Sequence, residues 1–396
     1  MSKVVIIGGG FSSVISAIYA SKINEVTILE RNDDILKKLL MTGNGRCNYF
    51  NDDQSLLNYN STNKEYIKDL ITDENINELK KFYEEIGILP RVINGYYYPY
   101  SNQALSVKEA LVSKLKEANV NIITNYYVKS IKKINNKFII NDDITCEKVI
   151  LATGGKSYPI TGSDGNGYNL LKELNLKVTD IYPALTPLVC DDKYLKKLSG
   201  VRSQAKVSFF NDNKLIKEEI GELQLTDYGV SGICIFNLSN LFYKYNGKKE
   251  IHINFMPFIN SKDELIKYLD NRDKIMNNKL ISELLNGILN NKVIKVIIDK
   301  SNLKDIKYKS LSLKEKEILC ENIFNYIMPI LDTKSFNKSQ VTMGGLSLDE
   351  IDIKTMQVKN IKNLYVVGEI LDIDGVCGGY NLTHCFITGF LAGKSI

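Results

Sequence analysis

The sequence has little of the chemistry that builds metal sites or disulfide frameworks. Tryptophan is absent, and the only two histidines, His252 and His384, lie far apart in the chain. None of the seven cysteines forms a C-x-x-C pair, and their number is odd. A zinc site and a disulfide framework are therefore not expected, and no other metal site is predicted. Scattered free thiols favour a reducing cytoplasm as the location.

Long apolar runs and blocks of charge of one sign are also missing. Before the first glycines the apolar run covers only Val4–Ile7, which is too short for a signal peptide or a membrane span. The net charge of +5 comes from 51 Lys+Arg against 46 Asp+Glu, with no block of five or more basic residues. No membrane partner and no clear nucleic-acid partner are expected. The oligomeric state is left open.

The length and the order of the patterns indicate several lobes. A chain of 396 residues exceeds what one hydrophobic core usually holds. The opening is a βαβ pattern: a buried strand at Val4–Ile7, a helix from Ser12, and a second strand at Val26–Leu29. We predict an α/β fold whose Rossmann-type domain is interrupted by two inserts. The predicted parts are 1–185 and 346–396 for the Rossmann-type domain, 186–260 and 330–345 for a β-rich, barrel-like insert, and 261–329 for a small helical insert.

A glycine fingerprint follows the first strand. Gly8 permits the tight turn after the strand, and Gly10 lets backbone approach a pyrophosphate at the helix N-terminus. Glu30 ends the second strand twenty residues after Gly10, where it can accept both ribose hydroxyls of an adenosine. Ser13 stands where the third fingerprint glycine is expected. The pattern predicts dinucleotide binding, and the acidic Glu30 disfavours NADP at this site, while FAD and NAD share the fingerprint. The alternative is a glycine turn in a plain α/β sheet.

Three further segments carry glycines beside polar side chains. Residues 38–48, KLLMTGNGRCN, form a loop able to wrap an anion or a planar polar ring. Residues 152–155, ATGG, follow an apolar strand and would let backbone pass close to a ligand. In residues 367–382, Glu369 could accept from ribityl hydroxyls. There, Gly378 and Gly379 would let backbone come near an isoalloxazine ring before a helix whose N-terminus stabilises negative charge. The strand at 363–367 is expected to join the N-terminal sheet.

Together these segments resemble the BaiN/YhiN flavoprotein family, whose members carry names such as aminoacetone oxidase-family enzyme and dehydro-bile-acid reductase. The resemblance rests on GGGFSSV, KLLMTGNGRCNYFN, ATGGKSYPITGSDGNGY, GELQLTDYGVSG, VTMGGLSLDEID and GEILDIDGVCGGYNLTHCFITGFLAG, which follow one another from residue 4 to 393. It implies a glutathione-reductase-like FAD domain with a β-barrel and a helical insert. The chain departs from the family at Ser13, Leu36 and Asn44, where glycine is usual.

The motifs and the resemblance together give the set of residues predicted to bind FAD. They are Gly8, Gly10, Phe11, Ser12, Glu30, Arg31, Lys38, Thr42, Gly45, Arg46, Cys47, Asn48, Val128, Thr153, Gly154, Gly155, Gly368, Glu369, Gly378, Gly379, Tyr380, Asn381 and Leu382.

The predicted function is that of an FAD-dependent oxidoreductase acting on a small organic substrate. Hydride would pass between flavin N5 and the substrate, for example in the reduction of an activated C=C bond with NADH or NADPH as a transient reductant. An oxygen-using amine oxidase is one alternative, and a flavin-binding regulatory or RNA-associated protein without turnover is another. No catalytic residue is assigned; His384, Tyr158 and Tyr228 are candidates for proton transfer, and each is also compatible with simple packing.

Overall fold

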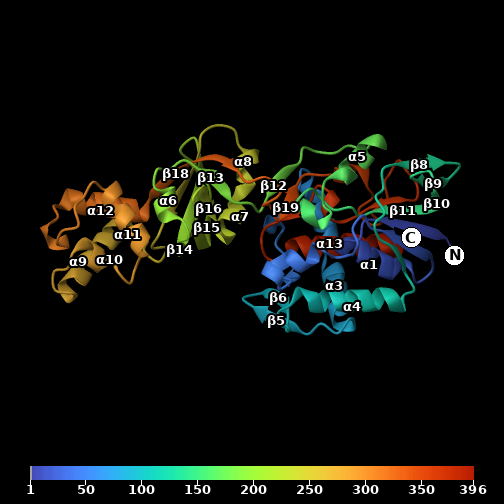
Figure 1. Ribbon diagram of the computed structural model, residues 1–396, viewed down its shortest axis with the longest axis horizontal. Helices are drawn as coiled ribbons and strands as arrows, with labels where there is room; N and C mark the ends of the chain where they lie inside the picture. The colour runs from blue at the N-terminus through green and yellow to red at the C-terminus, as the bar shows by residue number, and fades with distance from the viewer. Residues whose placement is uncertain (1) are drawn as a thin grey trace. The chain divides into compact units, whose positions relative to one another are not determined.

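The computed structural model describes residues 2–396, which form two compact units (Figure 1). The first unit contains the chain up to Ala184 together with Phe336–Ile396, and the second contains Leu185–Ser335. The chain therefore leaves the first unit once and returns to it.

A five-stranded parallel sheet organises the first unit, with the order β20-β11-β1-β2-β7. Its strands are β1 (Lys3–Ile7), β2 (Glu25–Leu29), β7 (Asn121–Ile123), β11 (Lys148–Leu151) and β20 (Leu364–Val366). The Val4–Ile7 run is buried, as expected for a parallel strand covered on both faces. β20 pairs with β11, so the predicted return of the C-terminal strand to the N-terminal sheet is confirmed.

Two helices from opposite ends of the chain pack closely beside this sheet. α1 (Phe11–Ala20) and α13 (Tyr380–Ser395) approach at Gly389 and Gly393, where a Cβ would lie 2.6 Å from the carbonyl oxygens of Ser12 and Ser16. The missing side chains allow the two backbones to meet. The second half of α13 is thereby packed against α1 of the βαβ unit.

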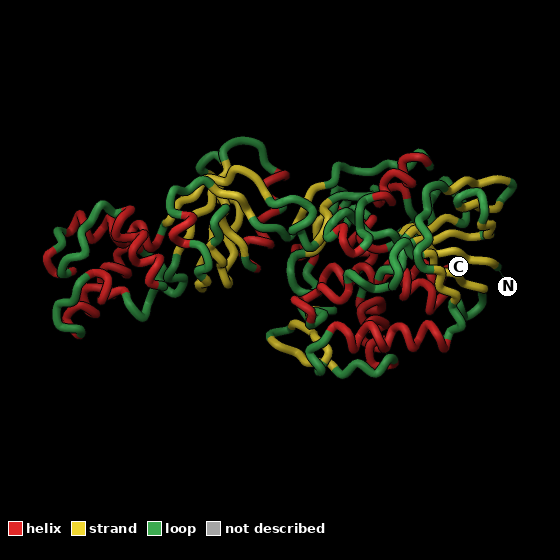
Figure 2. The backbone as a smooth tube through the Cα atoms, in the orientation of Figure 1, coloured by secondary structure: helices red, strands yellow, loops and turns green. Residues whose placement is uncertain are grey.

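Smaller elements complete the first unit (Figure 2). Its antiparallel strands are β3 (Phe50–Asn51), β5 (Pro90–Ile93) and β6 (Tyr96–Pro99) in one sheet, β8 (Ile131–Ile134), β9 (Lys137–Ile140) and β10 (Ile144–Cys146) in a second, and the pairs β4 (Tyr59–Asn60) with β21 (Asp374–Gly375) and β12 (Tyr182–Ala184) with β19 (Val341–Met343). Its other helices are α2 (Ile67–Leu70), α3 (Asp73–Glu85), α4 (Ala104–Glu117) and α5 (Asn166–Glu173).

The second unit combines a closed barrel with a group of helices. The barrel strands are β13 (Leu188–Cys190), β14 (Arg202–Asn211), β15 (Lys214–Leu225), β16 (Gly229–Ser231), β17 (Lys249–Asn254) and β18 (Tyr326–Thr333). The helices are α6 (Leu195–Leu198), α7 (Ile233–Ser239), α8 (Leu241–Lys244), α9 (Lys262–Ile275), α10 (Ile281–Leu285), α11 (Asn291–Lys300) and α12 (Leu313–Phe324). The predicted fold class, a Rossmann-type α/β domain with a barrel-like insert, is confirmed.

The second unit ends earlier than the predicted β-rich insert. The sequence prediction carried that insert to residue 345, whereas the unit ends at Ser335 and β19 pairs with β12 in the first unit. The β character near residue 341 is real but belongs to a two-stranded sheet of the first unit. Local pattern shows that a strand exists, not which strand it pairs with.

Candidate functional site

The glycine turn after β1 is packed tightly on one side. Gly8 has φ +102°, and a Cβ there would lie 2.5 Å from the carbonyl oxygen of Ala152. Only glycine suits a residue with both that conformation and that neighbour. The turn therefore lies directly against the segment that follows β11, and the ATGG motif meets the fingerprint.

The other side of the turn is open. A Cβ at Gly10 would meet nothing within 4 Å. Gly10 caps α1, and within residues 2–396 no side-chain hydrogen bond caps that helix. A helix N-terminus with free N–H groups facing space is suited to an anion such as a pyrophosphate.

Glu30 lies where the fingerprint requires an acidic residue, and it is buried. Its Oε2 accepts a hydrogen bond from the Gly9 amide at 2.6 Å, and its Oε1 accepts one from the Asn32 amide at 2.8 Å. Gly9 and Asn32 were not in the predicted set. The run of three glycines was the sequence signal that could have identified Gly9. A Cβ at Gly9 would lie 2.6 Å from Ile35 Cγ2, so the turn has no room for a side chain there. Glu30 thus orders the glycine turn and retains lone pairs for ribose hydroxyls.

Two buried hydroxyls near the ATGG turn have no hydrogen-bond partner among residues 2–396: Thr153 Oγ1 and Ser163 Oγ. Ser163 Oγ lies 3.3 Å from where a Cβ of Gly154 would be. Buried polar groups without partners are uncommon in proteins, and a bound ligand is one way to satisfy them. Together with the open space at Gly10 and the carboxylate of Glu30, they fit a dinucleotide along this edge of the sheet.

Lys38 and Glu369 form an ion pair that joins segments far apart in the sequence. Glu369 also accepts a hydrogen bond from the Thr342 amide at 3.0 Å. A Cβ at Gly155 would lie 2.4 Å from Thr342 Oγ1. The structure therefore brings the 38–48, 152–155 and 367–382 segments together, with Thr342 as a contact that sequence reasoning missed.

The TGNGRCN loop is held in shape by its own polar side chains. The side-chain Nδ2 of Asn48 donates to the carbonyl oxygens of Phe50 at 3.3 Å and Tyr97 at 2.9 Å. Arg46 Nε donates to the Gly43 carbonyl at 3.1 Å, and its guanidinium lies 5.1 Å from the centre of the Tyr98 ring. These side chains shape the loop and present its backbone.

Two of the three departures from the family lie at left-handed backbone positions. Leu36 has φ +60° and Asn44 has φ +57°. Glycine adopts this region without strain, asparagine tolerates it and leucine rarely does. The third departure, Ser13, is fully buried in α1, and its Oγ has no partner among the described residues.

Cys47 is a packed thiol. It has no exposed surface, and burial raises the pKa of its thiol to about 12. A thiol that stays protonated is a poor nucleophile. Cys47 is therefore packed within the loop as a protonated thiol.

The C-terminal glycines make contacts that differ from those predicted. A Cβ at Gly379 would lie 2.7 Å from the backbone N of Phe50, so it is β3 that approaches this residue closely. A Cβ at Gly378 would lie 2.8 Å from Tyr96 Cε1. The side chain of Asn381 binds the backbone of Gly375 twice. Its Nδ2 donates to the Gly375 carbonyl at 2.8 Å, and its Oδ1 accepts from the Gly375 N–H at 2.9 Å. Contacts within the protein therefore also favour glycine at both positions, and the close approach of an isoalloxazine ring to them stays a prediction.

The remaining predicted residues lie along the same edge. Arg31 pairs with Asp164, and Thr42 Oγ1 donates to the Leu39 carbonyl at 2.6 Å. A Cβ at Gly368 would lie 2.2 Å from Ser12 Oγ. Phe11 and Tyr380 are buried, Gly45 has φ +81°, and Leu382 is partly buried on α13.

The three candidates for proton transfer lie in different segments of the chain. His384 is fully buried on α13, and burial lowers its pKa to about 3, so it is neutral and closed to solvent. Tyr158 has φ +54° and precedes a short helical turn in the first unit. Tyr228 lies in the second unit, with the Lys334 ammonium 3.8 Å from its ring centre.

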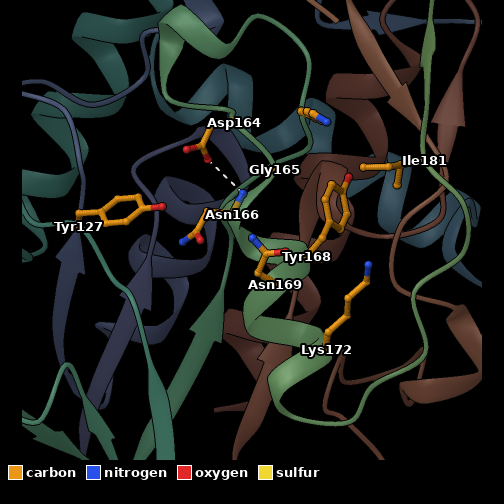
Figure 3. Close-up of a pocket in the computed structure, with 9 residues that line it drawn as sticks. Tyr127, Asp164, Gly165, Asn166, Tyr168, Asn169, Lys172 and Ile181 are labelled. Atoms are coloured by element: carbon orange, nitrogen blue, oxygen red, sulfur yellow. Dashed lines mark hydrogen bonds between the residues drawn. The ribbon is translucent and has the colours of Figure 1, made fainter.

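A polar pocket with a volume of about 330 Å³ adjoins the Arg31 end of the site (Figure 3). Asp164 in its wall pairs with Arg31, and Asn166 Nδ2 donates to the carbonyl oxygen of Val128 at 3.0 Å. Its lining residues are Tyr127, Lys156, Asp164, Gly165, Asn166, Tyr168, Asn169, Lys172 and Ile181. The pocket extends the site past the residues predicted to hold the adenosine.

Within residues 2–396, no group of three or more His, Cys, Asp or Glu side chains is arranged to hold a metal ion. Across the same residues, no helix has the length and apolarity needed to cross a membrane.

Comparison with known proteins agrees with this geometry. A family model described as "HI0933-like protein Rossmann domain" matches residues 2–395. The chain is 33% identical to a "3-dehydro-bile acid delta(4,6)-reductase" of Clostridium scindens, over 100% of this chain and 99% of that protein. It is 25% identical to a "Ribosomal RNA dihydrouridine synthase" of Haemophilus influenzae, over 100% of this chain and 98% of that protein.

Among solved structures, the chain is similar to the 3-ketosteroid-delta4-(5alpha)-dehydrogenase of Rhodococcus jostii. The TM-score is 0.51, the sequence identity is 14%, and the match covers 100% of this chain and 96% of that one. At this identity the likeness shows a shared fold.

Proposed function

Because the chain belongs to the HI0933-like Rossmann family, we propose that it reduces a carbon–carbon double bond conjugated to a carbonyl. The chain is an FAD-dependent oxidoreductase. The observation that carries the substrate class is the 33% identity, end to end, with a reductase named for the delta(4,6) bonds of a 3-dehydro-bile acid. We take NADH or NADPH as the source of the hydride.

The residues of the first unit divide the work of holding the cofactor. Glu30 would accept the ribose hydroxyls, and the N-terminus of α1 at Gly10 would face the pyrophosphate. The buried hydroxyls of Thr153 and Ser163 would gain partners. When bound, FAD would supply a carrier of two electrons between the nicotinamide and the substrate. Overall, the double bond takes up a hydride from NAD(P)H and a proton from water, which leaves NAD(P)⁺ and a C–C single bond.

The test is turnover of purified protein under anaerobic conditions with a panel of cyclic enones, each with NADH and with NADPH. We expect consumption of one nicotinamide per reduced double bond. A parallel aerobic assay with primary amines, followed by peroxide formation, tests the amine oxidase. Amine oxidation without enone reduction would overturn the proposal.

A second candidate substrate of the same chemical kind is a uridine in RNA. The C5=C6 bond of uracil is also conjugated to a carbonyl, and a relative is named for the dihydrouridine of ribosomal RNA. The charge distribution favours this candidate. Residues 185–335 carry 24 Lys+Arg and 19 Asp+Glu, so the whole net charge of +5 lies in the second unit.

Four exposed lysines of that unit lie on two adjoining segments: Lys279, Lys304, Lys307 and Lys309. An antiparallel bridge joins Leu280 to Lys307, and the Tyr308 amide donates to the Lys279 carbonyl at 3.0 Å. The neighbouring acidic side chains form hydrogen bonds with the backbone. Asp305 accepts one from the Ser282 amide at 2.9 Å, and Glu283 accepts one from the Leu280 amide at 3.0 Å. The lysines thus form a basic surface suited to phosphates.

Binding of a fluorescein-labelled, uridine-rich RNA hairpin over a series of KCl concentrations tests this candidate. If all four lysines neutralise phosphates, changing them to Gln lowers the slope of log K against log[KCl] by about 3. The matched control changes four exposed lysines of the first unit, Lys64, Lys68, Lys129 and Lys137, to Gln. Equal losses in both variants would show non-specific attraction and count against RNA as the substrate.

A further inference from the structure

One face of the β5–β6 hairpin adjoins the loops assigned to the flavin. In an antiparallel pair, residues opposite each other share a face, as do residues two apart on one strand. The register pairs Ile93 with Tyr96 and Arg91 with Tyr98, so these four side chains lie on the same face. Tyr97 lies on the other face, where its ring packs 5.1 Å from that of Phe50.

Two contacts place this face beside the candidate site. A Cβ at Gly378 would lie 2.8 Å from Tyr96 Cε1, and a Cβ at Gly43 would lie 3.6 Å from Tyr98 Cε1. The Arg46 guanidinium lies over the Tyr98 ring. Tyr96 and Tyr98 therefore border both the TGNGRCN loop and the glycine pair that precedes α13.

The same face leaves apolar surface exposed. Tyr96 is 36% exposed and Ile93 is 40% exposed, so the two neighbouring side chains offer apolar surface on one face of the hairpin. Tyrosine offers a rigid ring at low entropic cost and packs well against planar groups. A flat, conjugated ring would cover this surface, whereas a short aliphatic amine would leave most of it exposed.

We propose that Tyr96 and Tyr98 form the platform on which the substrate's planar, conjugated ring lies during reduction. This inference rests on the proposed function and adds the residues that select its substrate. The platform favours cyclic enones over open-chain ones, because only a ring spans two side chains on one strand. The role is contact and orientation, with no proton transfer assigned to either phenol.

The experiment compares Tyr96→Ala and Tyr98→Ala with Tyr100→Ala, a 66% exposed tyrosine just beyond the same strand. The probes are 2-cyclohexenone and 4-androstene-3,17-dione, titrated into the oxidised holoenzyme and followed by flavin absorbance. We expect each platform variant to raise Kd and KM about tenfold, with kcat changed less, and the control to match wild type. Tyr96→Phe and Tyr98→Phe keep the ring, so they should restore wild-type binding.

The following outcomes would overturn the proposal that Tyr96 and Tyr98 form a platform for the substrate. Unchanged Kd in the Ala variants would do so directly. A Phe variant as impaired as its Ala counterpart, with an altered pH profile, would make the phenol a proton donor. Loss of flavin from Tyr96→Ala and from Tyr96→Leu would assign the residue to the cofactor site. If wild type neither binds nor reduces either enone, the proposed function itself fails before any variant is compared.

Discussion

At the scale of single residues, Glu30 has two tasks that a substitution can separate. It accepts hydrogen bonds from the backbone amides of Gly9 and Asn32, and the glycine fingerprint predicts that it also binds the ribose. Glu30→Ala should weaken FAD binding by about 1.5–3 kcal/mol, the range for hydrogen bonds to a charged group. Titration of the apoprotein with FAD, followed by flavin fluorescence, measures this loss.

The control for Glu30 is Asp33→Ala, which removes a nearby exposed carboxylate that pairs with Lys37. Its FAD affinity should match wild type. Glu30→Gln keeps one acceptor oxygen and should lie between the two. An affinity unchanged by Glu30→Ala would show that the carboxylate serves the glycine turn alone.

His384 should make stability depend on pH. Burial lowers its pKa in the folded protein to about 3, against an ordinary value of 6.5, so the unfolded chain binds a proton that the folded chain does not. Stability therefore falls as pH drops below 6.5 and keeps falling until about pH 3. At pH 5 the loss from this residue is about 2 kcal/mol.

Urea unfolding of the wild type and of His384→Gln at pH 7 and pH 5 measures that dependence. The variant should lose less stability between the two values, whatever its stability at pH 7. Parallel losses in both proteins would mean that His384 gains a proton without unfolding.

The sequence predicted residues whose role is local, and missed those defined by distant contacts. Glu30 follows from a fixed spacing after Gly10, because the βαβ unit is a local structure. Thr342 touches Gly155 and Glu369 from a strand far along the chain, and no spacing predicts that contact. Asn381 was predicted to bind FAD, and the sequence did not indicate the two hydrogen bonds that its side-chain amide makes with the Gly375 backbone.

At the scale of elements, the N-termini of α1 and α13 differ in what surrounds their capping glycines. A Cβ at Gly10 would enter open space, and its φ of −78° suits any residue. Gly10→Ala should therefore change apoprotein stability by less than about 1 kcal/mol while it obstructs the pyrophosphate. Gly379→Ala places a Cβ against the Phe50 backbone at φ +95°, so it should lower apoprotein stability first.

Melting temperatures with and without FAD, together with flavin content, separate the two cases. The expected result is a Gly10→Ala protein that melts like the wild-type apoprotein and gains little from added FAD. If Gly10→Ala binds FAD normally, the pyrophosphate lies elsewhere.

Elements with strong periodicity were predicted well and short ones poorly. The predicted strand at 363–367 corresponds to β20 at Leu364–Val366, and the final helix begins at Tyr380. The β-type sequence run at 121–128 forms a strand only at Asn121–Ile123, because its later residues leave the sheet. Tertiary pairing, which local sequence does not encode, decides the ends of such strands.

At the scale of the whole molecule, the chain concentrates its binding chemistry in one unit and its net charge in the other. All the predicted cofactor residues belong to the first unit, whose two sequence segments meet at the pairing of β11 with β20. The barrel and helices of the second unit contribute none of them. We therefore expect cofactor binding to require the C-terminal segment, although the fingerprint lies at the start of the chain.

The central claim is that this first unit binds FAD. Denaturing the purified protein and identifying the released cofactor by chromatography tests it most directly, with reconstitution by FAD if the protein is isolated without flavin. The predicted result is FAD, in a ratio of one per chain. Release of FMN, or failure of the folded protein to take up FAD, would contradict it.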